Sequence, residues 1–390
     1  MRLLALTSFY PPLGYGYGAI CADVMEELAA RGHDVTVLCA DGGPGQGVDV
    51  EPGLAHVPAA WRRPLAGVRG EATSQRLVRS VMDRGVDVAF AWHMRGIGKG
   101  SLSVLHRAGI PVVYMFGDQW ALYEKPGLPG WWRGWNALDR VGPYHWLRQA
   151  SGSLALPFGI DLRQPPMAQA GHCVFSSRWL RDRCVADGFR PRDARVIPNG
   201  LRAGAFRPRD RPEREHPLLA FSGRVDRSKG ADLALRALAD LPEARLVAAG
   251  EAEPYVAALV GELGLADRVE LRGRQTRGDQ LPELLATADV VVMPGRVEEG
   301  FGLVYLEAMA AGTPIVGTAK GGPRDFCVDG ENMLVVGEEP HEIAAAVRRI
   351  LGDAGLRDRL VAGGLRTAAE HDLTVMTDRV EELVVSVSGR

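Results

Sequence analysis

Short apolar runs alternate with helix-like segments along most of the chain, and this alternation limits the fold more than any other feature. Runs of this length, separated by amphipathic segments, are typical of parallel β-strands joined by helices. The pattern predicts an α/β fold of two doubly wound parallel-sheet domains. In the first half the runs are Leu3–Thr7, Val35–Cys39, Val86–Ala91, Pro111–Met115, Cys173–Ser176 and Arg195–Ile197; the second half has LLAFSG (Leu218–Gly223), RLVAAG, VELRG, VVVM and PIVGT.

The segment between the two series, FRPRDRPEREHP (residues 206–217), is rich in proline and charge and has no apolar period. We predict that it is a linker between a first domain (1–205) and a second domain (218–372). The last segment (373–390) is predicted as a helix that could cross back to the first domain. Two such domains would face a deep cleft at the carboxyl ends of their strands, where ligands bind in these sheets.

Composition excludes several classes of protein. A length of 390 residues suits about two domains, and the net charge of −2 gives no reason to expect nucleic acid or an anionic membrane as a partner. The five cysteines are scattered, as in proteins of a reducing compartment. No apolar run reaches the length of about 18 residues needed for membrane insertion, and no cleavable signal pattern is present. We therefore expect a cytoplasmic protein, either a monomer or a homodimer.

The most informative single stretch is VEEGFGLVYLEAMAAGTPIVGT, which carries Glu299 and Glu307. An apolar strand, Ala288–Met293, precedes its glycine turn, and a helix containing Glu307 follows. Such a turn aims backbone N–H groups at an anion, and the start of a helix adds positive potential. The two carboxylates can then bind hydroxyl groups on either side of that anion. An anion flanked by hydroxyls describes a nucleotide-sugar.

A second turn, Ser222–Gly230 (SGRVDRSKG), follows a predicted strand and precedes the predicted helix Ala231–Ala239. It holds Arg224 and Lys229 where two cations can neutralise a diphosphate. A solvated surface loop is the alternative, but a second anion-binding turn in the same domain favours the diphosphate. The sequence has no D-x-D or D-x-H pair. We therefore expect no metal and no cofactor, with a nucleotide diphosphate sugar as co-substrate.

The first domain offers weaker signals. The segment PPLGYGYGAI places glycines, including Gly16 and Gly18, where the backbone can approach a phosphate or sugar closely. It matches neither the G-x-G-x-x-G fingerprint nor a phosphate-binding P-loop, so a flexible loop is the alternative. His93 and Asp118 each follow a predicted strand and are candidates for hydrogen bonding or proton transfer. A purely structural role for both is equally open.

Aromatic residues are concentrated in one region of the first domain. Flat rings suit sugar rings and other ring-shaped acceptors, although large core residues are the alternative. The candidates for contact with an acceptor are Trp92 and Trp120, with Tyr15 and Tyr17 from the glycine-rich segment. The other tryptophans of this region are Trp131, Trp132, Trp135 and Trp146.

Several motifs together resemble the family 4 retaining glycosyltransferases of the GT-B fold, which has two Rossmann-like domains. The similarity extends over nearly the whole chain and is strongest from about Leu218 to Leu351. Taken together, the motifs are specific for the fold and the family, but not for a donor or an acceptor. They are GHDVTVL (Gly32–Leu38), VIPNGL (Val196–Leu201), SGRVDRSKG, the E-x7-E stretch and EAMAAGTPIV (Glu307–Val316).

The resemblance implies a role for each motif. Arg224 and Lys229 would bind the donor diphosphate and stabilise the leaving nucleotide. Glu299 would bind hydroxyls of the donor sugar, and Glu307 would bind the ribose. The backbone of five residues would face the sugar and phosphate: Gly300, Phe301, Gly302, Leu303 and Val304. The other implied contacts, around the rest of the donor, are Gly16, Gly18, Gly223, Gly250, Arg274 and Gln275.

The chain departs from the family pattern at two places. Tyr15 and Tyr17 interrupt a pair of glycines that is usually adjacent, and Gly117 stands where a histidine usually precedes the aspartate. A role carried by that histidine cannot be transferred to this chain. His93 or Asp118 would have to take over the contact.

The predicted reaction is transfer of a sugar, with a UDP-sugar as the favoured donor, to a hydroxyl of a small-molecule or glycan acceptor. No carboxylate is obviously placed as a nucleophile, which favours same-face attack with retention and a leaving phosphate stabilised by cations. The alternatives are a lipid-linked or polysaccharide acceptor, a nucleotide-sugar epimerase or phosphorylase on the same fold, and a non-catalytic subunit that binds a sugar nucleotide.

Overall fold

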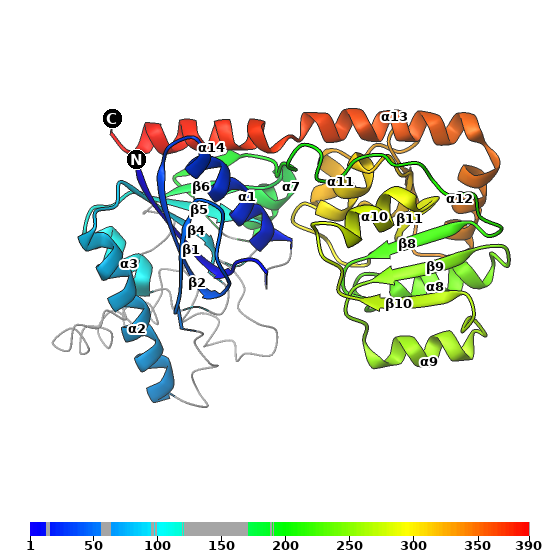
Figure 1. The fold of residues 1–390 in the computed structure, drawn as a ribbon, viewed down its shortest axis with the longest axis horizontal. Coiled ribbons are helices and arrows are strands. Elements are labelled where there is room, and N and C mark those ends of the chain that lie inside the picture. The colour runs from blue at the N-terminus through cyan, green and yellow to red at the C-terminus, as the bar shows by residue number, and fades with distance from the viewer. Residues whose placement is uncertain are drawn as a thin grey trace. The chain divides into compact units, whose positions relative to one another are not determined.

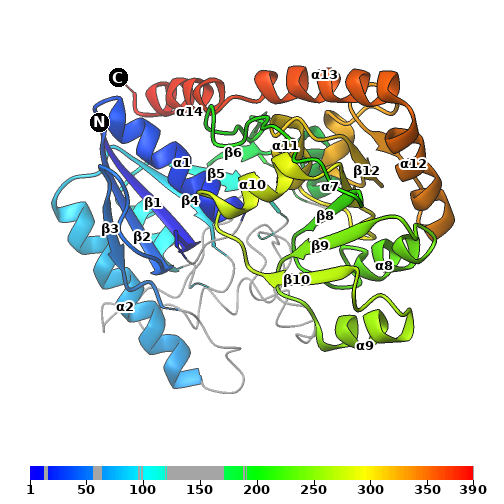
Figure 2. The ribbon, with the colours of Figure 1, turned by 45° about the vertical axis from the view of Figure 1, so that its right-hand side comes forward.

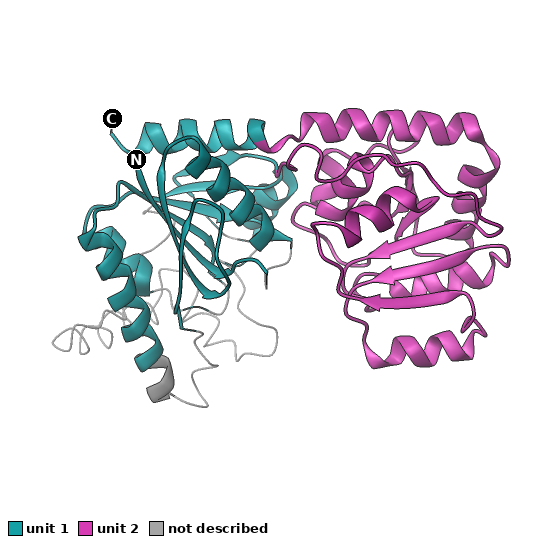
Figure 3. Ribbon diagram, viewed as in Figure 1, with its two compact units in different colours: residues 1–198, 374–390 teal, residues 199–373 magenta. Residues whose placement is uncertain are grey.

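The computed structural model describes the chain except for residues 13–15, 56–63, 95–96, 98–99, 119, 121–170, 188, 190 and 390. The described residues form two compact units (Figure 3). Unit 1 comprises Met1–Pro198 and Thr374–Arg390, and unit 2 comprises Asn199–Leu373. Among the described residues, no helix combines the length and the apolar character that crossing a bilayer requires.

Unit 1 is built on a seven-stranded parallel sheet with the order β3-β2-β1-β4-β5-β6-β7 (Figure 1). The middle strands are buried on both faces because helices cover both, so they appear in the sequence as continuous apolar runs. The strands are β1 (Arg2–Phe9), β2 (Asp34–Asp41), β3 (Asp49–Pro52), β4 (Val88–His93), β5 (Val112–Phe116), β6 (His172–Phe175) and β7 (Asp193–Val196), and the helices are α1 (Tyr17–Ala30), α2 (Pro64–Asp83), α3 (Gly100–Arg107), α7 (Arg178–Ala186) and α14 (Leu373–Val387).

Unit 2 repeats the architecture with a six-stranded parallel sheet, ordered β10-β9-β8-β11-β12-β13; Figure 2 shows its helices beside the strands. Leu219 and Phe221 pack into one core cluster and Ala220 into the other, because successive residues of a strand face opposite sides of a sheet. The elements are β8 (Leu218–Ser222), α8 (Ala231–Ala239), β9 (Arg245–Ala249), α9 (Pro254–Glu262), β10 (Val269–Gly273), α10 (Gln280–Thr287), β11 (Val290–Met293), α11 (Leu303–Ala310), β12 (Ile315–Gly317), η2 (Gly322–Asp325), β13 (Leu334–Val335), α12 (Pro340–Gly352) and α13 (Ala354–Glu370).

Both sheets reverse their direction of winding at one point. In unit 1 the order turns between β1 and β4, and in unit 2 between β8 and β11. Loops that leave the carboxyl ends of two such strands run to opposite faces of the sheet and open a crevice between them, where ligands bind in doubly wound folds. The predicted α/β fold with two Rossmann-like parallel sheets is confirmed, and each unit has one topologically defined place for a site.

Residues 206–217, expected to be a linker, instead run along unit 2. Phe206 is 5% exposed and belongs to a core cluster of that unit. The guanidinium of Arg211 donates a hydrogen bond of 2.7 Å to the carbonyl of Gly312. The chain passes between the units at residues 198/199 and 373/374. Proline and charge suggested a linker, but the contacts of this segment with unit 2 could not be read from composition.

The C-terminal helix α14 is anchored to unit 1 by an ionic cluster. Arg31, just after α1, contacts the Oδ1 of Asp378 at 2.7 Å and the Oε2 of Glu381 at 2.8 Å. The Nε2 of His33 lies 2.8 Å from the Oε1 of Glu381. The hydrogen bonds from His33 and Arg31 lower the pKa of Glu381. Val380 and Val384 of the same helix are fully buried, so apolar packing accompanies the ion pairs.

We predict that Glu381→Gln lowers the melting temperature at pH 7 by about 2–4 °C, which corresponds to about 1 kcal/mol for a partly exposed cluster. The pKa of Glu381 is lower in the folded state than its ordinary value of 4.5. Its contribution to stability is therefore complete above about pH 4.5 and is lost as the pH falls through the folded value. Thermal melts at several pH values should show the difference between wild type and variant shrinking in acid. Glu382→Gln, at an exposed neighbouring position, is the control.

Candidate functional site

The loop after β8 is organised by one carboxylate. Asp226 is 6% exposed, and its Oδ1 accepts hydrogen bonds from the hydroxyl of Ser228 at 2.6 Å and from the backbone N–H of Lys229 at 2.9 Å. Its Oδ2 lies 3.1 Å from Arg224. Burial alone would raise the pKa of Asp226, but these hydrogen bonds and the nearby cations lower it. The carboxylate therefore fixes the backbone of the turn at Lys229 and pairs with the guanidinium of Arg224.

The loop after β11 is fixed by close backbone contacts around Glu299. The N–H of Glu299 donates to the carbonyl of Lys320 at 3.1 Å, and its carbonyl accepts from the N–H of Gly322 at 2.7 Å. A Cβ on Gly321 would lie 2.4 Å from the carbonyl oxygen of Glu299. Gly321 also has a φ of +81°, so only glycine suits the position. The backbone that carries Glu299 is thus held in place from β12.

Lys229 and Glu299 meet at the point where the winding of unit 2 reverses. The Nζ of Lys229 lies 2.8 Å from the Oε1 of Glu299, and both side chains are 20% exposed. They come from the loops that follow β8 and β11, which are neighbouring parallel strands. The sequence motifs predicted a diphosphate contact for Lys229 and, separately, a sugar contact for Glu299. The structure brings them together as an ion pair that remains accessible from solvent.

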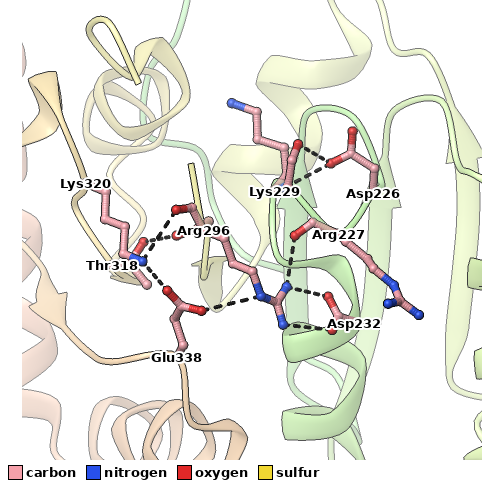
Figure 4. A network of polar contacts seen from close by, with 10 residues as sticks. Asp226, Arg227, Lys229, Asp232, Arg296, Thr318, Lys320 and Glu338 are labelled. Atoms are coloured by element: carbon pink, nitrogen blue, oxygen red, sulfur yellow. Dashed lines mark hydrogen bonds and ion pairs between the residues drawn. The ribbon is translucent and has the colours of Figure 1, made fainter. Parts of the chain in front are cut away.

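A second ionic network joins the same two loops (Figure 4). The guanidinium of Arg296 binds both oxygens of Asp232, at 2.7 and 2.9 Å, and donates to the carbonyl of Arg227 at 2.9 Å. On its other side it lies 3.4 Å from Glu338, which also pairs with Lys320. Arg296 therefore connects the loop of Lys229 to the loop of Glu299, and sequence analysis did not single it out.

We predict that Arg296→Met destabilises unit 2 by about 1–2 kcal/mol, because Asp232 loses a bidentate partner while remaining mostly buried. The melting temperature should fall by about 2–8 °C. Binding of any ligand to the Lys229–Glu299 region should also weaken. Arg324→Met, an exposed arginine in the neighbouring η2, is the control. Equal stability of the two variants would show that the network does not tie the loops together.

The N-terminus of α11 lies directly after this pair. Gly302 is the N-cap, with a φ of +90° and no side-chain cap. The first backbone N–H groups of a helix have no partner within the helix, so those of Leu303 and Val304 are available in principle to an anion. The side chain of Phe301 is 4% exposed and packs in the core, leaving only its backbone for a ligand.

Glu307 lies in the second turn of α11 and is paired with a residue that sequence analysis missed. Its side chain is 4% exposed, and its Oε1 lies 2.7 Å from the Nη2 of Arg277. Arg277 comes from the loop between β10 and α10. Two donor contacts expected from this loop stay predictions. Arg274 is half exposed near Glu251, and the amide of Gln275 donates to the backbone carbonyls of Arg272 and Arg274.

The remaining glycines of unit 2 allow close approach between loops. A Cβ on Gly250 would lie 1.6 Å from the carbonyl oxygen of Gly223, so the loops after β8 and β9 touch through their backbones. Gly223 has a φ of +124° and Gly250 a φ of +152°. Both positions therefore need glycine for the fold of the loops, whether or not a ligand also uses them.

In unit 1 the start of α1, which follows β1, contacts the loop that follows β5, where Tyr17 lies against Gly117. A Cβ built on Gly117 would lie 2.4–2.5 Å from carbon atoms of the Tyr17 ring. The same ring packs against Trp92 with centroids 5.6 Å apart, and the indole N–H of Trp92 donates to the carbonyl of Tyr17 at 3.2 Å. Burial, with Cys21 and Asp118 nearby, raises the pKa of Tyr17 well above its usual value, so the phenol is neutral. The Tyr17 ring fills the space that a side chain at position 117 would need.

We predict that Gly117→Ala lowers stability by about 1–3 kcal/mol, the usual cost of overpacking a well-filled region. Tyr17→Ala removes the ring that a Cβ at position 117 would clash with. In the Tyr17→Ala background, Gly117→Ala should therefore cost much less stability than it does in the wild type. Denaturant unfolding of the four proteins in a double-mutant cycle measures the coupling. Additive effects of the two substitutions would contradict the contact.

His93 and Asp118 lie close together at the same edge of the unit 1 sheet. The Nε2 of His93 is 3.8 Å from the Oδ2 of Asp118, which is an ion-pair distance and too long for a hydrogen bond. The other carboxylate oxygen of Asp118 accepts the backbone N–H of Trp120 at 2.9 Å. His93 is the last residue of β4, so the strand ends two residues after the predicted end at Ala91. Both side chains keep access to solvent, 15% for His93 and 41% for Asp118.

The tryptophans expected to contact an acceptor are core residues in the structure. Trp92 is fully buried and Trp120 is 1% exposed, stacked on Phe116 with centroids 5.1 Å apart. Their ring faces are covered by protein, so the assignment to acceptor binding is replaced by a packing role. Tyr15, Trp131, Trp132, Trp135 and Trp146 lie outside the described residues.

The glycines of the first loop serve the local fold. Gly16 is the N-cap of α1 with a φ of +49°. A Cβ on Gly18 would lie 3.0 Å from the carbonyl oxygen of Phe9, so α1 starts in close contact with the end of β1. This geometry explains both glycines without a ligand and leaves their expected contact with a donor as a prediction.

Comparison with known proteins agrees with this architecture. The fold and the paired loops define a protein with two Rossmann-like domains and a candidate anion site in the second. The model of the family Glycosyl transferases group 1 matches residues 205–366, and that of Glycosyltransferase Family 4 matches residues 16–203. D-inositol 3-phosphate glycosyltransferase 1 of Catenulispora acidiphila is 30% identical over 84% of this chain and 79% of its own length. The chain belongs to glycosyltransferase family 4.

Other relatives match over shorter stretches. The D-inositol 3-phosphate glycosyltransferases of Acidothermus cellulolyticus (32% identical, 61% of this chain) and Mycobacterium marinum (35% identical, 49% of this chain) are covered over 57% and 44% of their lengths. The chain thus spans about half the length of these relatives. Among solved structures, Anabaena Alr3699/HepE in complex with UDP-glucose has a TM-score of 0.73 at 18% identity, covering 99% of this chain and 100% of that one. AviGT4, involved in avilamycin A biosynthesis, has a TM-score of 0.62 at 24% identity, covering 99% of this chain and 98% of that one.

Proposed function

We propose that the protein is a retaining glycosyltransferase that moves a sugar from a nucleotide diphosphate sugar to a hydroxyl of a small-molecule acceptor. The observation that carries the proposal is the Lys229–Glu299 pair, 2.8 Å apart at the winding reversal of unit 2. A cation for a phosphate and a carboxylate for sugar hydroxyls lie side by side there, next to the N-terminus of α11, which has no side-chain cap.

The donor contacts follow from this arrangement. Lys229 and Arg224 would neutralise the diphosphate, with the amides of Leu303 and Val304 supplying further donors. Arg224 is 68% exposed, so it can reach a ligand without disrupting the core. Glu299 would accept hydrogen bonds from hydroxyls of the sugar. Because side chains and backbone amides would stabilise the negative charge of the phosphates, we propose that transfer does not require a metal.

Chemistry at this site would consist of one displacement on a single face of the sugar. The bond from the anomeric carbon to the phosphate oxygen breaks, and the electron pair leaves with the diphosphate. The acceptor oxygen bonds to the same carbon from the same face, and its proton passes to the leaving phosphate oxygen. Catalysis then depends on positioning and on electrostatic support of the leaving group. In unit 1 we propose His93 and Asp118 as the groups that contact the acceptor hydroxyl.

The donor and acceptor can be found by binding. A ligand at about 100 times its Kd stabilises the folded protein by about 2.7 kcal/mol, so a correct donor should raise the melting temperature clearly. UDP-, GDP- and dTDP-sugars are the first set, and the UDP-glucose complex of the HepE structure supports starting with UDP-glucose. The names of the relatives support D-inositol 3-phosphate as one test acceptor. If no nucleotide-sugar shifts the melting temperature, the proposal is wrong.

We predict that Lys229→Ala lowers kcat by about 100-fold, because it removes a preorganised cation from the leaving group. The measurement is release of nucleoside diphosphate with the donor and acceptor found above, with the anomeric configuration of the product checked by NMR. Arg236→Ala, at an exposed position on α8, is the matched control in the same unit. Turnover by Lys229→Ala at the wild-type rate would remove Lys229 from the mechanism.

A further inference from the structure

Among the aromatic residues predicted to contact an acceptor, Tyr17 keeps partial access to solvent, whereas Trp92 and Trp120 are buried. Its ring contacts residues of two neighbouring strands. It packs against Trp92 near the end of β4, with centroids 5.6 Å apart, and lies against Gly117, just after β5. The indole N–H of Trp92 also donates to the carbonyl of Tyr17 at 3.2 Å. The ring and the backbone of Tyr17 are therefore both held at the carboxyl ends of these strands.

The packing of the ring leaves the hydroxyl of Tyr17 open. The hydroxyl makes no hydrogen bond to another residue in the described part of the chain, and it is not one of the buried polar atoms there that lack a partner. Because the side chain is partly exposed, the hydroxyl is accessible to solvent. Burial, with Cys21 and Asp118 nearby, raises the pKa of Tyr17 well above its usual value. The group is therefore a neutral phenol, which can both donate and accept a hydrogen bond.

Two further polar side chains lie at the same edge of the sheet. His93 ends β4 and Asp118 follows Gly117, with 3.8 Å between the Nε2 of His93 and the Oδ2 of Asp118. Tyr17 contacts the residue that precedes each of them, and the carboxylate of Asp118 is close enough to affect the pKa of the phenol. An ionised carboxylate only accepts hydrogen bonds, whereas a neutral phenol also donates. Together the three side chains can bind more than one oxygen of a ligand.

We propose that the hydroxyl of Tyr17 donates a hydrogen bond to an oxygen of the acceptor, and that the acceptor is a polyol. This inference rests on the proposed function, which assigns the acceptor hydroxyl to His93 and Asp118. The hydroxyl that receives the sugar contacts these two residues, and a second oxygen of the acceptor binds Tyr17. An acceptor with a single hydroxyl leaves the phenol without this partner. Tyr17 is thus a specificity residue and takes no proton in the reaction.

Glycine at position 117 is part of the same arrangement. A Cβ there would lie 2.4–2.5 Å from carbon atoms of the Tyr17 ring, so a larger residue displaces the ring and the hydroxyl with it. If the ring served packing alone, this displacement would lower stability and nothing else. The proposal adds a loss of acceptor affinity that depends on the hydroxyl being present.

The test measures steady-state transfer from the nucleotide-sugar that stabilises the protein most, with D-inositol 3-phosphate, myo-inositol and D-glucose as polyol probes. Tyr17→Phe removes the hydroxyl and keeps the ring. It should raise the acceptor KM by about 3–10-fold, the effect of one neutral hydrogen bond, while the donor KM and the melting temperature stay at wild-type values. Tyr10→Phe is the matched control, because the hydroxyl of Tyr10 is buried and has no hydrogen-bond partner among the described residues. It should leave both KM values unchanged.

A double-mutant cycle on the acceptor KM separates the hydroxyl from the packing of the ring. Gly117→Ala should raise the acceptor KM in the wild-type background, because it displaces the hydroxyl. It should raise the KM less in the Tyr17→Phe background, where no hydroxyl is left to displace. An unchanged acceptor KM in Tyr17→Phe, or a donor KM that rises as much as the acceptor KM, would overturn the inference.

The inference and the proposed function fail in different ways. If nucleotide-sugars bind the wild type and none of the polyol probes accepts a sugar, the inference is wrong and the proposed donor site stands. If no nucleotide-sugar binds the wild type, the proposed function itself is wrong, and the inference falls with it.

Discussion

The parallel pairing of β8 with β11 is the constraint on which the candidate site depends. These two strands are neighbours in space although β9 and β10 come between them in the chain. The register of this pairing places Val290 beside Leu219 and Val291 beside Ala220, and so aligns the ends of the two strands. The loops that leave those ends must then lie against each other. Lys229 can meet Glu299 for this reason, and the network around Arg296 reinforces a proximity that the sheet has already set.

Much of this was predictable from sequence, because the information was local. Helix Ala231–Ala239 was predicted with the observed bounds, and the strand, turn and helix around Glu299 follow one another within a short stretch. Partners far apart in the chain were not predictable. Arg277 is one of three arginines in the stretch LRGRQTR, and nothing in the spacing selects the one that reaches Glu307. Edge strands as short as Leu334–Val335 also carry too few residues for a recognisable pattern.

The errors in unit 1 share one physical cause. A tryptophan such as Trp92 or Trp120 can either stack on a ligand or pack in a core, and only its burial distinguishes the two roles. Burial depends on which segments cover a residue, as Phe116 covers Trp120. Gly117 is the converse case. An absent side chain suggested a lost function, and the structure shows that Tyr17, a tyrosine 100 positions away at the start of α1, occupies the space.

The pairing of Lys229 with Glu299 has a consequence for how a donor would be selected. Before a ligand arrives, the positive charge of Lys229 is largely neutralised by the carboxylate 2.8 Å away. A nucleoside diphosphate alone would have to compete with Glu299 for the cation. A nucleotide-sugar brings hydroxyls that can satisfy Glu299, so the carboxylate gains new partners as Lys229 turns to the phosphate. Under the proposed function, recognition of the sugar and stabilisation of the diphosphate are therefore coupled, because one ion pair must open for both.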